Sequence, residues 1–111
     1  MGKNNKNIDR QILRKYFLQD VYLTGRVVHN DRDVFLDGKK HFLLRNVIIP
    51  EQNDVQGAVH LDHIWIDDSQ LDETYIGKKV RVYGVIQAYQ RRNGSYSFGI
   101  DPNRVDVVAE N

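Results

Sequence analysis

Tyrosines and arginines alternate along the segment 79–90 and recur in the residues that follow it. In chain order the group consists of Arg81, Tyr83, Gln87, Tyr89, Arg91, Arg92 and Tyr96. Residues two apart in an extended strand project from the same face, so the first four share one face. Flat aromatic rings stack with nucleobases, which contributes about 1–3 kcal/mol per base, and arginines track the phosphates. The group predicts a surface for single-stranded nucleic acid. The alternative is that these tyrosines only stabilise the sheet through cross-strand pairs.

A second basic group comes from earlier in the chain. It consists of Tyr22, Arg26, His29, Arg32, Lys39, Lys40 and Arg45. Three aspartates are interspersed with it, which makes this surface only weakly basic; they are Asp31, Asp33 and Asp37. We expect Tyr22, Arg26 and the Lys39-Lys40 pair to extend the nucleic-acid surface. For the two lysines, a solvated turn is an equally weighted alternative.

The segment His60-Leu61-Asp62-His63 has residue types that bind metals, because imidazole and carboxylate groups at short spacing can hold zinc. On a strand, however, His60 and Asp62 share one face and His63 points to the other, so three ligands would not converge. No nucleophile or acid–base pair lies nearby. We therefore expect no metal, no cofactor and no catalysis, and a metal-dependent hydrolase ranks third among the functions. Trp65 is expected in the core, with base stacking as its alternative.

Charge is distributed unevenly along the chain, although the formal net charge is only +1. Residues 1–50 carry ten Lys/Arg against five Asp, and residues 78–111 carry six Lys/Arg against three acids. Between them, residues 51–77 carry seven Asp/Glu and no Lys or Arg. Such asymmetry can present a basic face to a polyanion. The acidic segment 51–77 either repels nucleic acid from one flank or serves as a protein-docking edge.

Composition narrows the protein class. The 111 residues fit one domain, and the hydrophobic fraction of 41% can form a core. There is no cysteine, which excludes disulfides and cysteine-ligated zinc. No apolar run approaches the length of a membrane-spanning helix, and the N-terminal residues lack the apolar run of a signal peptide. A cytoplasmic protein without membrane contact is expected.

The first nineteen residues differ in pattern from the rest of the chain. Residues 1–7 are polar and predict a flexible start. Residues 8–19 predict a short amphipathic helix, because apolar side chains recur at the spacing of one helical face: Ile8, Ile12, Leu13, Tyr16 and Phe17. This helix either plugs the following domain or mediates self-association. Residues 20–111 form the predicted β domain.

Strand patterns dominate the β domain. Strands are predicted at 20–29, 34–36, 41–49, 58–66, 79–90 and 95–100, and a last extended segment at 104–109. Asp37-Gly38 predicts a hairpin turn between 34–36 and 41–49, and Asn93-Gly94 predicts another before Ser95. The segment 67–75 predicts a short helix or turn. Asp101-Pro102-Asn103 is expected to break the last strand.

Two stretches carry a family resemblance. Gly77-Lys78-Lys79-Val80-Arg81-Val82-Tyr83-Gly84-Val85, with Tyr89 and the Asn93-Gly94 turn, resembles the fourth strand and hairpin of OB-fold nucleic-acid-binding proteins. Leu23-Thr24-Gly25-Arg26-Val27 is similar to their first strand, where a glycine lets the strand curve. The resemblance implies a mainly β, five-stranded OB-type barrel with a short helix between strands 3 and 4. The chain lacks the Gly/Pro/Gln-rich linker and acidic tip of bacterial single-stranded-DNA-binding proteins.

The expected function is non-enzymatic binding of single-stranded nucleic acid, DNA ahead of RNA, with little sequence preference. A replication or recombination accessory factor of a phage or plasmid fits this composition. Because one fold serves many functions, an OB-fold protein–protein adaptor that uses the acidic segment 51–77 is the main alternative.

Overall fold

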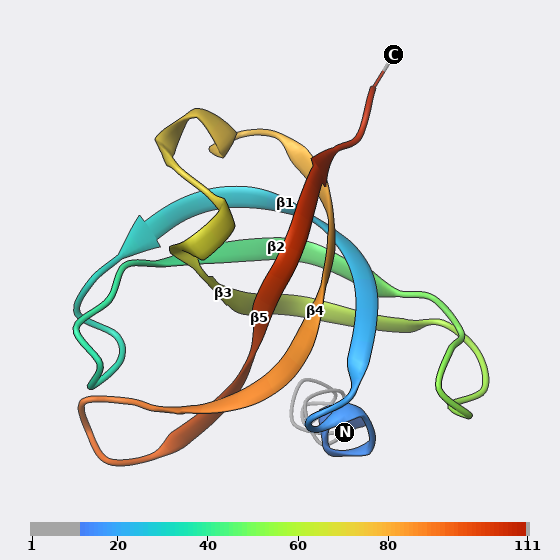
Figure 1. Ribbon diagram of the computed structural model, residues 1–111, viewed down its shortest axis with the longest axis horizontal. Helices are drawn as coiled ribbons and strands as arrows, with labels where there is room; N and C mark the ends of the chain where they lie inside the picture. Colours follow the sequence, from blue (N-terminus) through green and yellow to red (C-terminus); the bar gives the residue numbers. More distant parts are fainter. Residues whose placement is uncertain (1–11, 111) are drawn as a thin grey trace, which may run out of the picture.

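The computed structural model describes residues 12–110, which form a closed five-stranded barrel (Figure 1). The strands are β1 (Asp20–Asp31), β2 (His41–Ile49), β3 (Val59–Asp67), β4 (Lys79–Gln90) and β5 (Tyr96–Val107). Their order around the barrel is β1-β2-β3-β5-β4, and β4 closes it by pairing with β1. All neighbours are antiparallel except β3 and β5. The predicted five-stranded barrel is therefore confirmed.

The barrel is filled by the side chains that alternate toward its inside. On β4 the predicted alternation holds as far as Ile86, because Val80, Val82 and Ile86 are fully buried, whereas Ala88, expected on the same inner face, is exposed. The other strands contribute further members of the same core, including Leu23, Val27, Phe42, Leu44, Ile64, Ile66 and Ile100. This packing supplies the hydrophobic driving force and leaves the opposite side chains of each strand outside.

A β-bulge lets the last strand run on without a break. The expected interruption at Asp101-Pro102-Asn103 is wrong, since β5 is continuous through these residues. Across β4, Tyr83 pairs with Arg104 and Gly84 pairs with Pro102, so Asn103 is left over as the extra residue of the bulge. A bulge tolerates proline, which has no N–H to give to the ladder. The strands come so close that a Cβ atom at Gly84 would lie 2.2 Å from the carbonyl oxygen of Asp101.

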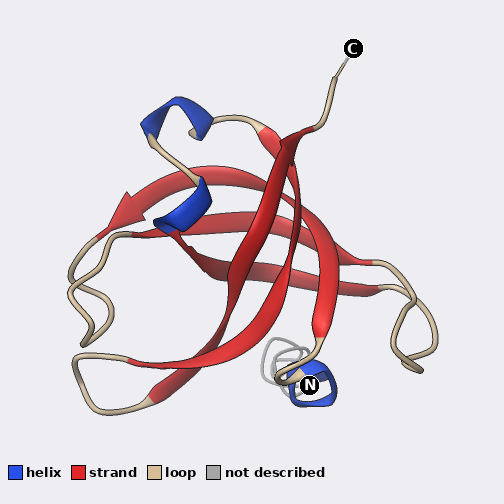
Figure 2. Cartoon of the chain, viewed as in Figure 1, coloured by secondary structure: helices blue, strands red, loops and turns tan. Residues whose placement is uncertain are grey.

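The predicted helices are not formed in the described part of the chain, where each helical element is a short 3-10 turn (Figure 2). Between β3 and β4 lie η2 (Asp68–Gln70) and η3 (Glu73–Tyr75). Asp67 and Asp72 accept hydrogen bonds from the backbone N–H groups of Ser69 and Thr74. Such local capping competes with longer helices, and Leu71 between the turns is extended.

The predicted N-terminal helix over residues 8–19 lies partly outside the described residues. Its described part is η1 (Leu13–Tyr16), after which Leu18 adopts a left-handed backbone with φ of 62° and turns the chain into β1. Leu13 and Tyr16 are fully buried in the barrel core. This element therefore packs into one end of the barrel, as the plugging alternative predicted. No helix within residues 12–110 has the length and apolarity needed to span a membrane.

The loop between β1 and β2, residues 32–40, does not form the predicted hairpin strand at 34–36. Its Phe35 forms a β-bridge with Arg91, beyond the end of β4. Leu36 N–H donates to the Gln90 carbonyl at 2.8 Å, and Arg92 N–H donates to the Val34 carbonyl at 3.1 Å. In place of residues 34–36, it is β1 that pairs with β2 on that edge. The two backbone hydrogen bonds connect the β1–β2 loop to the β4–β5 hairpin.

Candidate nucleic-acid interface

Two tyrosines form a stack on the outer surface of the barrel. Tyr22 on β1 and Tyr83 on β4 are direct ladder partners, and this register places their rings together. The ring centres are 6.1 Å apart and the planes differ by 29°. Tyr22 is 37% exposed and Tyr83 is half-buried. We call Tyr22 and Tyr83, with Arg81 and Arg104, the tyrosine platform.

Two arginines flank the rings. The guanidinium carbon of Arg104 on β5 lies 5.4 Å from the centre of the Tyr83 ring, a cation–π distance. Arg104 also pairs with Asp106 at 3.0 Å, and this carboxylate raises the pKa of the guanidinium. Arg81 is exposed two residues before Tyr83, and the ion pairs of the described residues do not involve it. Arg81 thus shares the outer face of β4 with Tyr83, and Arg104 lies over the Tyr83 ring.

Gln52 in the β2–β3 loop fixes the backbone of Tyr22. Its Oε1 accepts a hydrogen bond from the Tyr22 N–H at 2.8 Å. Its Nε2 donates to the Tyr22 carbonyl at 2.9 Å and to the Pro50 carbonyl at 2.8 Å. The side-chain amide thus pairs with β1 in the way a neighbouring strand would. Nothing in the sequence pattern indicated this contact, because Gln52 lies thirty residues from Tyr22 in a polar loop.

The platform borders a pocket of about 370 Å³. Its lining includes Tyr22, Tyr83, Gln52, Asn53 and Asn103. The volume lies at the lower end of the range of small-molecule sites, roughly 300–1,000 Å³. Flat aromatic rings beside amide groups are the arrangement that a nucleobase needs for stacking and edge contacts.

Tyr89, near the other end of β4, has a different environment from Tyr83. It packs against a second apolar cluster on the outside of the barrel, whose buried members are Phe35, Leu43 and Trp65. Its ring lies 5.5 Å from that of Phe35 and 5.2 Å from that of His41. Burial, ahead of the nearby carboxylates of Asp67, Asp101 and Asp37, raises the pKa of the Tyr89 phenol well above its ordinary value.

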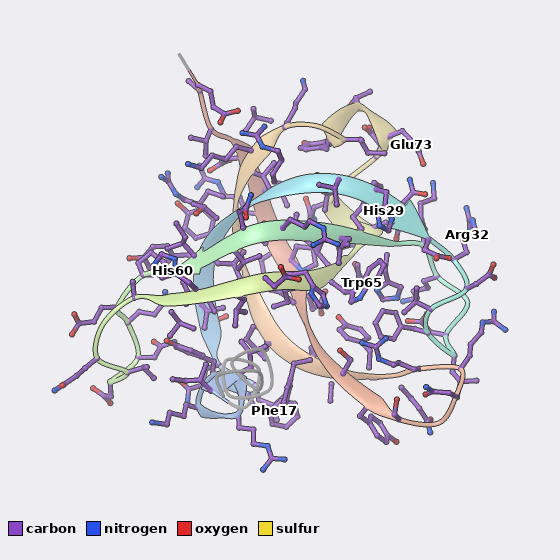
Figure 3. The ribbon with its side chains drawn as sticks, turned by 180° about the vertical axis from the view of Figure 1, so that it is seen from behind. Phe17, His29, Arg32, His60, Trp65 and Glu73 are labelled. Carbon is purple, nitrogen blue, oxygen red and sulfur yellow. The ribbon has the colours of Figure 1, made fainter. Side chains whose placement is uncertain are left out.

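Trp65 is buried, as expected, but in this outer cluster rather than inside the barrel; its exposure is 7%. Figure 3 shows it beside His29, with a ring distance of 6.0 Å. The cluster is covered by Phe35 from the β1–β2 loop, whose ring centre is 5.9 Å from that of Trp65.

The remaining candidate residues are spread over several parts of the surface. Arg91 and Arg92 lie in the β4–β5 hairpin, where Arg91 packs over the Phe35 ring at 5.9 Å and Arg92 approaches Asp33 at 4.0 Å. Tyr96 in the same hairpin is 68% exposed.

Other candidate residues lie away from the hairpin. Lys39 and Lys40 belong to the β1–β2 loop, and Lys40 pairs with Glu73. Arg26 pairs with Glu110 and donates to the Gly77 carbonyl. Gln87 lies between the tyrosine platform and Tyr89 on β4.

The histidines considered as metal ligands lie on β3. His63 Nδ1 is 3.1 Å from Asp62, and Arg45 approaches the same carboxylate at 3.4 Å. His60 is exposed near the end of β3 remote from Trp65 (Figure 3). Within residues 12–110 no group of three or more His, Asp or Glu side chains is placed to hold a metal ion.

Comparison with known proteins gives a structural neighbour. No protein-family model matches the sequence, and no curated protein matches it. Among solved structures, the dimeric N-terminal domain of PriB protein from Thermoanaerobacter tencongensis superposes with a TM-score of 0.50. The two are 21% identical, and the match covers 82% of this chain and 97% of that one. The closed β1-β2-β3-β5-β4 barrel and this likeness together identify the chain as an OB-fold protein.

Proposed function

We propose that the protein binds single-stranded nucleic acid on the tyrosine platform, with DNA as the first ligand and with little overall sequence preference. The observation that carries the proposal is the part-exposed Tyr22–Tyr83 stack with Arg81 and Arg104 beside it. Every base has a flat π-face, so stacking accepts any sequence. A non-enzymatic accessory role in replication or recombination follows from this kind of binding.

Stacking alone gives modest affinity. Two bases contribute about 2–6 kcal/mol, and a dissociation constant of 1 mM corresponds to about 4 kcal/mol. Micromolar binding, at about 8 kcal/mol, therefore needs the phosphate contacts of Arg81 and Arg104 as well. An aromatic ring for stacking and a cation for a phosphate lie on neighbouring strands, because Arg104 on β5 is the ladder partner of Tyr83 on β4.

A fluorescence titration with labelled dT and rU oligomers at two salt concentrations tests the proposal. We expect measurable binding at low salt that weakens as salt rises, with dT bound at least as tightly as rU. Affinity no better than millimolar at low salt would contradict it. Tyr96→Ala serves as a matched variant, because Tyr96 is more exposed than Tyr22 and lies in the distant hairpin. If Tyr96→Ala weakens binding while Tyr83→Ala does not, the interface lies at the loops instead.

A further inference from the structure

The pocket beside the tyrosine platform has polar groups that stacking does not use. We propose that it takes one nucleobase carrying an exocyclic amino group, which is recognised by Asn103 and Asp20. The proposal rests on the proposed function and deepens it: a strand bound with little sequence preference has one position at which the base is read.

The β5 bulge supplies the first recognition group. Asn103 is the residue that the ladder skips between Pro102 and Arg104, and bulges re-aim side chains in this way. Asn103 is exposed and lines the pocket next to Tyr83 and Gly84. Its amide makes no hydrogen bond within residues 12–110. One donor group and one acceptor are therefore left for a ligand.

The second group is a carboxylate. Asp20 lies two residues before Tyr22 on the outer face of β1 and lines the same pocket. Only its backbone carbonyl is engaged, by Asn53 Nδ2 at 2.8 Å. An ionised carboxylate only accepts hydrogen bonds. Of the described residues that line the pocket, none is lysine or arginine, so the chemistry suits a base and disfavours a phosphate.

The Asn103 amide can pair with either an amino or a carbonyl group, so Asp20 is the group that distinguishes the bases. Adenine, cytosine and guanine each carry an amino group that donates to a carboxylate or an amide oxygen, whereas thymine and uracil present carbonyl oxygens there. A carbonyl oxygen of the base facing the Asp20 carboxylate would bring two hydrogen-bond acceptors together with no donor between them. The wall of the pocket is fixed as well, because Gln52 holds both backbone groups of Tyr22. The pocket therefore favours an amino-bearing base over thymine or uracil.

The test uses three dT octamers that differ at one central position, which is dT, dU or dC. Cytosine and uracil have the same ring shape and differ in the amino-versus-carbonyl pattern, so dU is the matched control for dC. We expect the dC octamer to bind about three- to tenfold more tightly than the other two, the effect of one net hydrogen bond. Asp20→Asn should abolish the preference for dC over dU, whatever it does to affinity for the dT octamer, because an amide can donate to a carbonyl as well as accept from an amino group.

The outcomes separate the two proposals. Equal affinities for the three octamers, or a dC preference retained in Asp20→Asn, would overturn the base pocket and leave the proposed function standing. Loss of all binding in the wild-type protein would overturn the proposed function and the pocket with it. Tyr83→Ala should weaken binding of all three octamers by the same factor, because stacking does not depend on the amino group.

Discussion

At the scale of single residues, the tyrosines on the outer face of β4 have different neighbours and therefore different roles. Tyr83 meets Tyr22 and the Arg104 cation at the surface. Tyr89 covers Gly99, where a Cβ atom would lie 2.9 Å from the tyrosine ring, and is surrounded by Phe35 and His41. The sheet-stabilising alternative thus describes the packing of Tyr89, whereas Tyr83 is the ring that we propose a ligand contacts.

Replacing Tyr83 by alanine should weaken binding of a dT oligomer by roughly 5- to 150-fold, because the stacking of one base, about 1–3 kcal/mol, is lost. The half-buried ring lies outside the barrel core, so the melting temperature should change little. Tyr83→Phe keeps the aromatic face and should bind like the wild type. An unchanged dissociation constant in Tyr83→Ala, measured by anisotropy, would remove Tyr83 from the interface.

The half-buried phenol of Tyr89 predicts a loss of stability at alkaline pH. Burial raises its pKa in the fold, while in the unfolded chain it ionises near its ordinary value of about 10. Above that pH the unfolded state releases a proton that the native state keeps, so stability falls as pH rises. Urea unfolding at pH 9 and pH 11 should show a smaller loss in Tyr89→Phe than in the wild type. Tyr16, whose phenol pKa burial also raises, contributes in the same direction, so Tyr16→Phe is the parallel variant. Identical losses in all three proteins would contradict this account.

At the scale of elements, the β1–β2 loop is held by one anchoring side chain. Phe35 is fully buried among Trp65, Tyr89 and His41, although most residues around it in the loop are exposed. Two backbone hydrogen bonds tie the same loop to the β4–β5 hairpin. Backbone hydrogen bonds thus connect the two loops that flank the usual OB binding surface.

Phe35→Ala should destabilise the protein by about 3–5 kcal/mol, the usual cost of removing a buried phenylalanine. Trp65 is the only tryptophan, so its fluorescence reports on this cluster alone. We expect its emission to shift to the red in Phe35→Ala under native conditions, as the indole becomes hydrated. Leu36→Ala is the control, since Leu36 is adjacent and 55% exposed. Equal effects of the two substitutions on emission and stability would show that Phe35 does not anchor the loop.

The elements also show what sequence patterns can predict. The bounds of β4 follow from alternation of apolar residues, because one face of that strand lies in the core. Those of β2 follow from an apolar run that ends at Pro50, and the first four residues of that strand are all buried. The continuity of β5 does not follow, since Pro102 is compatible with a strand only at a bulge that its partner Gly84 permits. The segment 34–36 has strand residues, but it pairs with the distant hairpin rather than with its neighbour in sequence.

The candidate site was predictable only in part for the same reason. Tyr22 and Tyr83 are recognisable as candidates by residue type, but their contact depends on the β1–β4 register, which joins residues sixty-one positions apart. Arg104 and Gln52 carry no local signal. Arg104 reaches Tyr83 through the β5 register, and Gln52 acts through its hydrogen bonds to a backbone. A pattern of alternating residues does not determine which distant strands pair or in which register.

At the scale of the whole molecule, positive and negative charges nearly balance. Arg26, Lys40, Arg45 and Arg104 each face a carboxylate, and the net charge is only +1. Attraction of a polyanion by the protein as a whole should therefore be weak, and the electrostatic part of binding should come from the few cations at the interface.

This view predicts a shallow salt dependence. For single strands, the logarithm of the binding constant falls with the logarithm of salt concentration by roughly 0.7 for each phosphate neutralised. Contacts from Arg81 and Arg104 give a slope no steeper than roughly −1.4, and Arg81→Gln should reduce it by half or more, because Arg104 is already paired with Asp106. Arg45→Gln is the control, because Arg45 lies on β2 in an ion pair with Asp62. Titrations of a dT oligomer across a salt series measure both slopes. A much steeper slope, or equal effects of the two substitutions, would mean that the strand contacts the hairpin arginines or the general surface. In that case cations outside the platform would have to supply the phosphate contacts, and Tyr22 and Tyr83 would be paired for the stability of the sheet alone.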